Sequence, residues 1–199
     1  MARREKFDII KIHTKNVSLI WKNVRGIAPD VTSLKTEAAM LDWLYELTEA
    51  LQIWIDKGLH MTDGELILAR INLGAVVESW LRLFYCTYYD EYILNPRKNK
   101  KGKIIEPESG LRFEDLKKYS IGILWDDETE PEYIWVNEVQ HKRNAVHSFQ
   151  YRDIGTPRDF LNDIERFYDF VQNIVFRLPN VEDSLESYPP GYVTNVYYE

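Results

Sequence analysis

Apolar residues recur at helical spacing through most of the chain. After Thr32 and Ser33, either of which can cap a helix, they repeat every three or four residues at Leu41, Leu44, Thr48, Leu51 and Ile55. Gly58 then supplies the residue type that most often follows a helix. The pattern predicts one helix from about residue 33 to residue 57.

A longer helix follows from Asp63 to about Ile93, where the residues are apolar on most faces. Thr62 and Glu65 have the spacing of a capping box. A helix that is apolar nearly all round is expected at the centre of a bundle, covered by neighbours on several sides. Polar residues nevertheless interrupt it, and charges at bilayer depth are costly, so it is not expected to span a membrane.

Four residues of this long helix share one face because they are spaced by four: Arg70, Gly74, Glu78 and Arg82. Two interpretations remain open. One is a ladder of ion pairs within the helix. The other is a polar seam, in which Glu78 orients a cation from a neighbouring element.

Three further helices are expected downstream. One covers Leu111 to Trp125 with an interruption near Gly122. The next begins at Pro131 and carries apolar residues at Ile134, Val136, Val139, Val146 and Phe149. The last is capped by Thr156 and runs from Pro157 to Arg177. The chain is therefore predicted to be all-α, an up-and-down bundle of four to six helices.

The segments outside these helices divide the chain. Residues 1–32 are predicted to form an N-terminal arm, as a short helix or a docking segment, and residues 33–180 the helical domain. Residues 181–199 are an irregular tail rich in tyrosine and proline, which packs on the body or docks on a partner. Asn95 to Gly110 is a loop insertion, and its basic residues mark a solvated turn or a flap near a phosphate backbone: Arg97, Lys98, Lys100, Lys101 and Lys103.

Composition narrows the choice of function. The net charge of -7 argues against broad electrostatic binding to nucleic acid, although a local basic cleft stays compatible with it. The single cysteine, Cys86, lies in an apolar run and is expected to be a buried residue rather than a metal ligand. No apolar signal core follows the basic N-terminus, so we expect a cytoplasmic protein without metal or cofactor.

The best candidates for chemistry are three polar residues in one short run, Arg143, Asn144 and His147. A guanidinium offers a planar fork of donors to phosphate oxygens, and histidine moves protons near neutral pH. Asparagine can bind a phosphate oxygen or fix the histidine tautomer. RNA supplies its own nucleophile, the 2′-hydroxyl, so such a set needs no metal. Arg143 and His147 share a face only if a helix continues through both.

The segment from Gln140 to His147 resembles the signature of the HEPN superfamily, the higher-eukaryote and prokaryote nucleotide-binding domains. The resemblance covers roughly residues 33–180. It implies a small helical bundle and a metal-independent endoribonuclease of a bacterial defence or toxin–antitoxin system. It also implies a homodimer in which two motifs meet. RNA and an antitoxin or defence protein are the expected partners.

In that superfamily, four to six residues separate the arginine from the histidine, whereas Arg143 is followed by three and Lys142 by four. Arg143 therefore acts from a shifted turn, or Lys142 takes its place. Substrate contacts are assigned to Lys142, Glu78, Lys100, Lys101 and Lys103. The alternatives are a non-catalytic interaction or dimerisation module and a nucleotide sensor that only binds.

Overall fold

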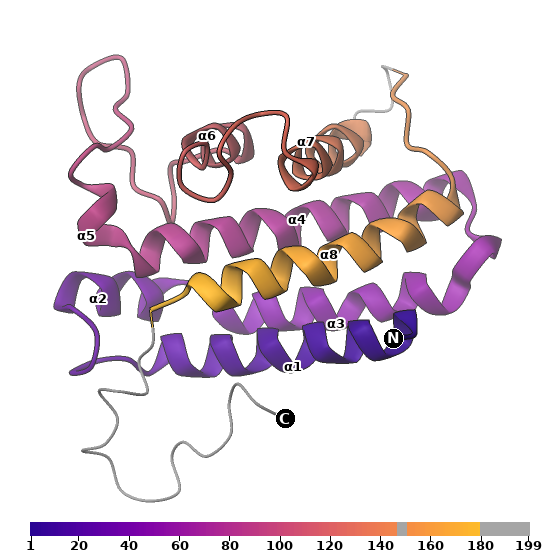
Figure 1. Ribbon diagram of the computed structural model, residues 1–199, viewed down its shortest axis with the longest axis horizontal. Helices are drawn as coiled ribbons and strands as arrows, with labels where there is room; N and C mark the ends of the chain where they lie inside the picture. The colour runs from indigo at the N-terminus through magenta and orange to yellow at the C-terminus, as the bar shows by residue number, and fades with distance from the viewer. Residues whose placement is uncertain (147–150, 180–199) are drawn as a thin grey trace, which may run out of the picture.

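The computed structural model describes residues 1–146 and 151–179, and these residues confirm the all-α class. Eight α-helices lie in the described ranges (Figure 1). Five longer ones build the bundle: α1 (Arg3–Lys22), α3 (Leu41–Lys57), α4 (Asp63–Thr87), α7 (Pro131–Arg143) and α8 (Pro157–Arg177). Three shorter ones, α2 (Asp30–Ala38), α5 (Tyr89–Tyr92) and α6 (Phe113–Tyr119), flank it. Within these ranges, no helix has the length and apolar character needed to cross a membrane.

The long helix α4 lies at the centre, as its apolar composition predicts. It packs against α3, α7 and α8, and Leu73, Val76 and Val77 have no exposed surface. Helices α1, α3 and α4 alternate in direction (Figure 1). The segment containing α6 and α7 then carries the chain back along the molecule, so that α8 runs in the same direction as α4.

The expected helix starts at α4 and α8 are confirmed. Thr62 accepts a hydrogen bond from the amide of Glu65, whose carboxylate accepts one from the amide of Thr62. Thr156 and Asp159 make the same reciprocal pair at α8, with Pro157 as the first helical residue. These two helices begin where local side chains satisfy the free amides of the first turn.

Residues 3–22, predicted as part of an N-terminal arm, form the 20-residue helix α1. Its inward face buries Phe7, Ile10, Val17 and Trp21, and it packs between α3 and α8. Burying each such side chain stabilises the fold by about 1.5–3 kcal/mol. The helical body therefore begins at Arg3.

The prediction of one helix across residues 33–57 is wrong. The chain leaves helical geometry at Ala39, whose backbone is extended, and α3 begins at Leu41. No proline or glycine marks this break. Ser33 donates hydrogen bonds to the carbonyls of Val24 and Ala28, so contacts distant from the break hold α2 at its own angle.

A buried carboxylate joins three helices. Asp163 on α8 accepts hydrogen bonds from Arg70 on α4 and, at 3.1 Å, from the indole nitrogen of Trp135 on α7. The Arg70 side chain is 1% exposed and that of Asp163 is 6% exposed. Arg70 Nε also donates to the carbonyl of Ile154 at 3.0 Å, which fastens the segment before α8.

We expect Asp163→Ala to lower the free energy of unfolding by about 3–5 kcal/mol, because it leaves the buried Arg70 guanidinium without its counter-charge. Urea denaturation followed by circular dichroism measures the loss. Asp169→Ala, at an exposed position of the same helix, is the control and should change stability by about 0.5 kcal/mol or less. Equal effects of the two substitutions would contradict a structural role for the buried pair.

Candidate functional site

The candidate motif lies at the carboxyl end of α7. The α-helix ends at Arg143, and a 3₁₀ turn, Asn144–Val146, follows. The prediction that this helix continues past Arg143 to Val146 is therefore wrong, since Asn144 is the C-cap; Phe149, to which it was also extended, lies outside the described residues. His147 lies outside the described residues, so its position relative to Arg143 stays a prediction.

Arg143 forms an ion pair with Glu78 of α4, at 2.7 Å between Nη1 and Oε2. The Arg143 side chain is 33% exposed, whereas that of Glu78 is 11% exposed. The guanidinium carbon also lies 5.8 Å from the centre of the Phe113 ring. The carboxylate therefore fixes one edge of the guanidinium from below while a third of the side chain faces solvent.

Gly74 provides the space for this arrangement. A Cβ atom on Gly74 would lie 2.7 Å from Cβ of Arg143 and 2.8 Å from its Cγ and Cδ. Such contacts are far inside van der Waals distance, and the first involves an atom attached directly to the backbone of α7. Only glycine at this position lets α7 approach α4 this closely.

The seam on α4 combines the two interpretations that its spacing allows. Glu78 pairs with Arg82 within the helix, at 2.7 Å. Arg82 in turn donates to the carbonyl of Pro107, at 2.9 Å, in the loop before α6. Arg70, Gly74 and Glu78 each contact a residue of another element. The polar seam therefore serves mainly to bind neighbouring segments to α4.

Lys142 turns toward the interior instead of standing beside Arg143. Its ammonium lies 3.3 Å from Asp163 and 3.8 Å from Glu138, and its side chain is 17% exposed. Lys142 thus shares the carboxylate that Arg70 binds. This engagement favours Arg143 over Lys142 as the cation of the motif.

Lys117 of α6 fixes the same end of α7 from the opposite side. Its side chain is 3% exposed, and it contacts Glu114 at 2.9 Å and Gln140, the first residue of the motif, at 3.0 Å. Burial disfavours the charged form of Glu114, but hydrogen bonds from Lys117, Lys118 and Gln140 outweigh burial and lower the pKa of Glu114 to about 2. The Glu114 carboxylate therefore stays ionised at neutral pH.

The three loop lysines do not join this site. Lys100, Lys101 and Lys103 are exposed on a tight turn closed by Asn99, whose side chain accepts from the amides of Lys101 and Lys103. Figure 1 shows this loop rising at the end of the molecule near α5, whereas α7 ends toward the other end. The structure thus brings Glu78 to Arg143 but keeps the basic loop apart from them.

Other residues with reactive potential lie elsewhere. Of the remaining histidines, His60 and His141 are exposed, and His13 contacts Gln172 with its pKa lowered by burial. Burial raises the pKa of the Cys86 thiol to about 12, so it is not a nucleophile at neutral pH. The described parts of the chain contain no group of three or more His, Cys, Asp or Glu residues placed to hold a metal ion.

Two residues that matter here were missed in the sequence. Asp163 lies three residues after Phe160 and four before Phe167, on the buried face of α8. A lone carboxylate on an apolar face indicates a buried partner, and that signal was present. Lys117 carries no comparable signal, because short charged stretches such as Lys117-Lys118 usually face solvent.

Comparisons with protein-family models, with curated proteins and with solved structures find no match to this chain.

We expect Gly74→Ala to destabilise the protein by about 1–3 kcal/mol, because overpacking forces α7 away from α4. Gly64→Ala is the matched control in the first turn of the same helix, where an added Cβ has no atom within 4 Å. That control should instead gain up to about 1 kcal/mol from alanine's higher helix propensity. Thermal and urea unfolding measure both changes, and a gain in both variants would contradict the close approach of Arg143.

Proposed function

We propose that this chain is a metal-independent endoribonuclease of the HEPN type, and that it acts in a bacterial defence or toxin–antitoxin system. The reaction type and the setting rest on the resemblance of residues 140–147. The observation that carries the proposal is the Arg143 guanidinium, fixed by Glu78 on one edge and one-third exposed. Its remaining N–H donors have no hydrogen-bond partner among the described residues and can bind a phosphodiester.

The charge balance around Arg143 suits an anionic substrate. Arg143 and Arg82 share the single carboxylate of Glu78. Two guanidiniums against one carboxylate leave a net positive charge at this point of an acidic protein. Such local placement permits phosphate binding even though the net charge of -7 disfavours nucleic acid over the rest of the surface.

In the proposed reaction, His147 acts as a general acid or base. Loss of the 2′-hydroxyl proton lets the 2′ oxygen form a bond to phosphorus, and the bond from phosphorus to the 5′ oxygen breaks. The 5′ oxygen takes up a proton, so the products carry a 2′,3′-cyclic phosphate and a 5′-hydroxyl. Arg143 stabilises the charge that develops on the phosphoryl oxygens, and Asn144 orients the phosphate or the imidazole.

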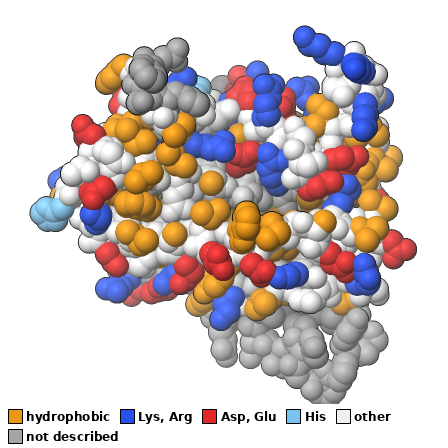
Figure 2. Space-filling model, turned by 180° about the vertical axis from the view of Figure 1, so that it is seen from behind, with side chains coloured by type: hydrophobic (Ala, Val, Ile, Leu, Met, Phe, Trp, Pro, Cys, Tyr) orange, Lys and Arg blue, Asp and Glu red, His pale blue; other side chains and the backbone are white. Residues whose placement is uncertain are grey.

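A second candidate function is a non-catalytic dimerisation module, and one surface favours it. Apolar side chains extend over adjacent faces of α3 and α4, and we call this surface the α3–α4 apolar face: Trp43, Leu47, Trp54, Leu68 and Ile71. Trp43 is 58% exposed and Leu68 is 53% exposed. Figure 2 shows apolar side chains gathered on this side of the molecule. A second copy of the chain is the occupant that the resemblance implies, and a dimer serves both candidates.

We expect the purified protein to cleave mixed RNA in EDTA and to leave 2′,3′-cyclic phosphate ends. His147→Ala should lower the rate by about 10²–10⁴-fold, the usual contribution of one general acid or base. Arg143→Lys should lower it too, because lysine keeps the charge but loses the planar fork. His141→Ala, at an exposed position six residues before His147, is the matched control. Cleavage that survives His147→Ala, or is absent from the parent, would refute the nuclease.

We expect the parent protein to sediment as a dimer, and Leu68→Glu to weaken the dimer by about tenfold or more, since burying one leucine contributes at least that factor. Analytical ultracentrifugation across a concentration series measures the change. Leu94→Glu, at a position 84% exposed beyond α5, is the control and should leave the dimer intact. A parent that stays monomeric throughout would argue against both the dimer and the second candidate. A dimer without RNA cleavage would favour the second candidate.

A further inference from the structure

A cavity of about 500 Å³ opens at the end of the molecule opposite to the motif. It lies between the carboxyl end of α4, helix α5, the end of α6 and the end of α8. Its wall consists mainly of aromatic rings: Phe84, Tyr85, Tyr88, Tyr92 and Tyr119. Ile123 and the exposed side chains of Glu91 and Arg177 complete it. We call it the aromatic pocket.

The tyrosines offer their rings to the pocket because their hydroxyls are already engaged. Tyr85 shares a hydrogen bond of 2.7 Å with Ser120. Tyr92 donates to the carbonyl of Ile105 at 2.6 Å, and Tyr119 donates to that of Asn95 at 2.7 Å. Tyr88 donates to the carbonyl of Arg177. An occupant of the pocket therefore gains ring and apolar contacts.

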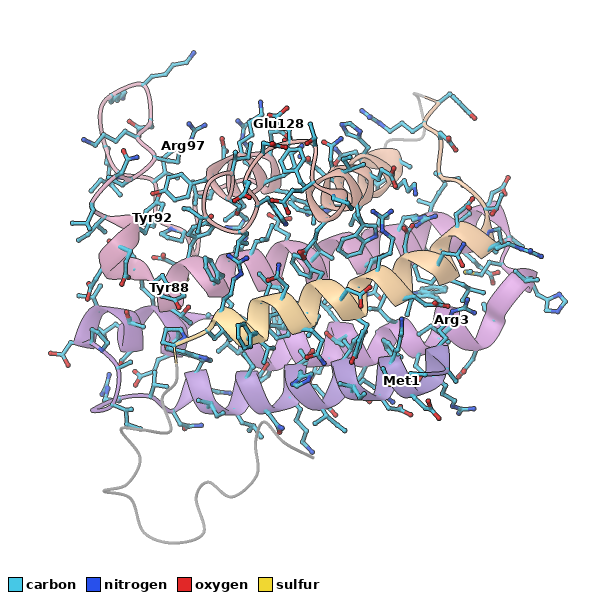
Figure 3. All side chains as sticks on the ribbon, in the orientation of Figure 1. Met1, Arg3, Tyr88, Tyr92, Arg97 and Glu128 are labelled. Atoms are coloured by element: carbon cyan, nitrogen blue, oxygen red, sulfur yellow. The ribbon has the colours of Figure 1, made fainter. Side chains whose placement is uncertain are left out.

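The chain leaves α8 at the rim of this pocket. Arg177, the last residue of α8, is part of the lining. Two residues later, Pro179 borders a second cavity of about 280 Å³, which shares Tyr88 and Glu91 with the aromatic pocket. Figure 3 shows Tyr88, Tyr92 and Arg97 at this same end of the molecule. Pro179, after which residues 180–199 follow in the sequence, therefore lies next to the aromatic pocket.

The sequence of those residues matches the chemistry of the pocket. Tyr188-Pro189-Pro190-Gly191-Tyr192 combines two rings with two prolines. Proline-rich segments favour the extended polyproline II helix, and aromatic-lined grooves are the surfaces that bind it. Eight residues lie between Pro179 and Tyr188, so an extended chain from one to the other spans up to about 30 Å.

The charges of residues 180–199 and of the surface around the pocket also favour contact between the two. Residues 180–199 contain carboxylates at Glu182, Asp183, Glu186 and Glu199 and no lysine or arginine. The end of the molecule that holds the pocket carries Arg177 and the basic loop, whose lysines at 98, 100, 101 and 103 form no ion pair with the described residues. The carboxylates between Pro179 and Tyr188 would thus start beside cations.

We propose that the aromatic pocket is the docking site of the segment Tyr188–Tyr192 of the same chain. Covalent attachment gives the segment an effective concentration in the millimolar range, so a modest intrinsic affinity suffices. The docked segment fills the pocket and excludes proline-rich or aromatic peptides of other proteins from it.

Photo-cross-linking of the full chain tests this placement. A benzophenone amino acid, p-benzoyl-phenylalanine, replaces Tyr188 in one protein and Tyr197 in a control. We expect the first to cross-link to residues within 84–92 or 119–123 and to keep the mass of a monomer. The control should give at least about tenfold less of this product, since burying one aromatic side chain is worth that factor.

Two surface variants complete the test. Ile123→Glu places a negative charge at the pocket, of the same sign as the carboxylates of residues 180–199, at a position 44% exposed. It should lower the cross-link yield about tenfold, because one buried aliphatic contact is lost. Ile53→Glu, at a position 55% exposed on α3, should leave the yield unchanged. The proposal is overturned by cross-links outside the pocket, by a product with the mass of two chains, which would place the segment on a second copy, or by a yield indifferent to Ile123→Glu.

Discussion

The arrangement of the motif depends on one buried carboxylate. Asp163 accepts hydrogen bonds from Arg70 on α4 and from Trp135 on α7. It also forms an ion pair with Lys142, which lies on α7 too. Removing two cations and a carboxylate from water is costly, and their mutual attraction repays the cost only when the geometry satisfies all partners. An apolar core would tolerate many small rotations of α7, whereas this cluster ties α7 to α4 and α8 through directional hydrogen bonds and ion pairs. The orientation of Lys142 determines, through the adjacent residue, where Arg143 must lie.

Residues spaced by four on α4 extend this constraint to the segments before and after residues 147–150. Arg70 holds the carbonyl of Ile154, Gly74 admits the side chain of Arg143, and Glu78 binds its guanidinium. Segments on both sides of residues 147–150 are therefore fastened to one face of one helix. Three residues lie between Arg143 and His147 in the sequence, so chain length alone keeps their Cα atoms within about 14 Å of each other.

How well the sequence predicts each part depends on how local its cause is. The starts of α4 and α8 follow from capping residues within three positions, and both were predicted to the residue. Hydrophobic periodicity alone extends the helices past the break at Ala39 and past the end of α7 at Arg143. Both features depend on contacts with distant segments, which periodicity does not contain. Contact between Glu78 and a cation of a neighbouring element was one of two interpretations of the four-residue spacing on α4, and Arg143 is that cation. The need for glycine at position 74 follows from how closely α4 and α7 approach each other. A sequence pattern does not contain that distance.

The molecule thus separates two kinds of surface. Near the end of α7, charges are organised by a carboxylate on α4, and the guanidinium left partly open suits an anion. At the far end, tyrosine rings whose hydroxyls are hydrogen-bonded present apolar faces, and the loop lysines there form no ion pair within the described parts of the chain. Because the basic loop lies with the rings and apart from Arg143 (Figure 1), the cations most exposed to solvent are poorly placed to guide RNA to the motif. In the proposed nuclease, substrate selection at Arg143 would therefore rest on short-range contacts made by α7 and α4 and, in the proposed dimer, by a second copy of the chain.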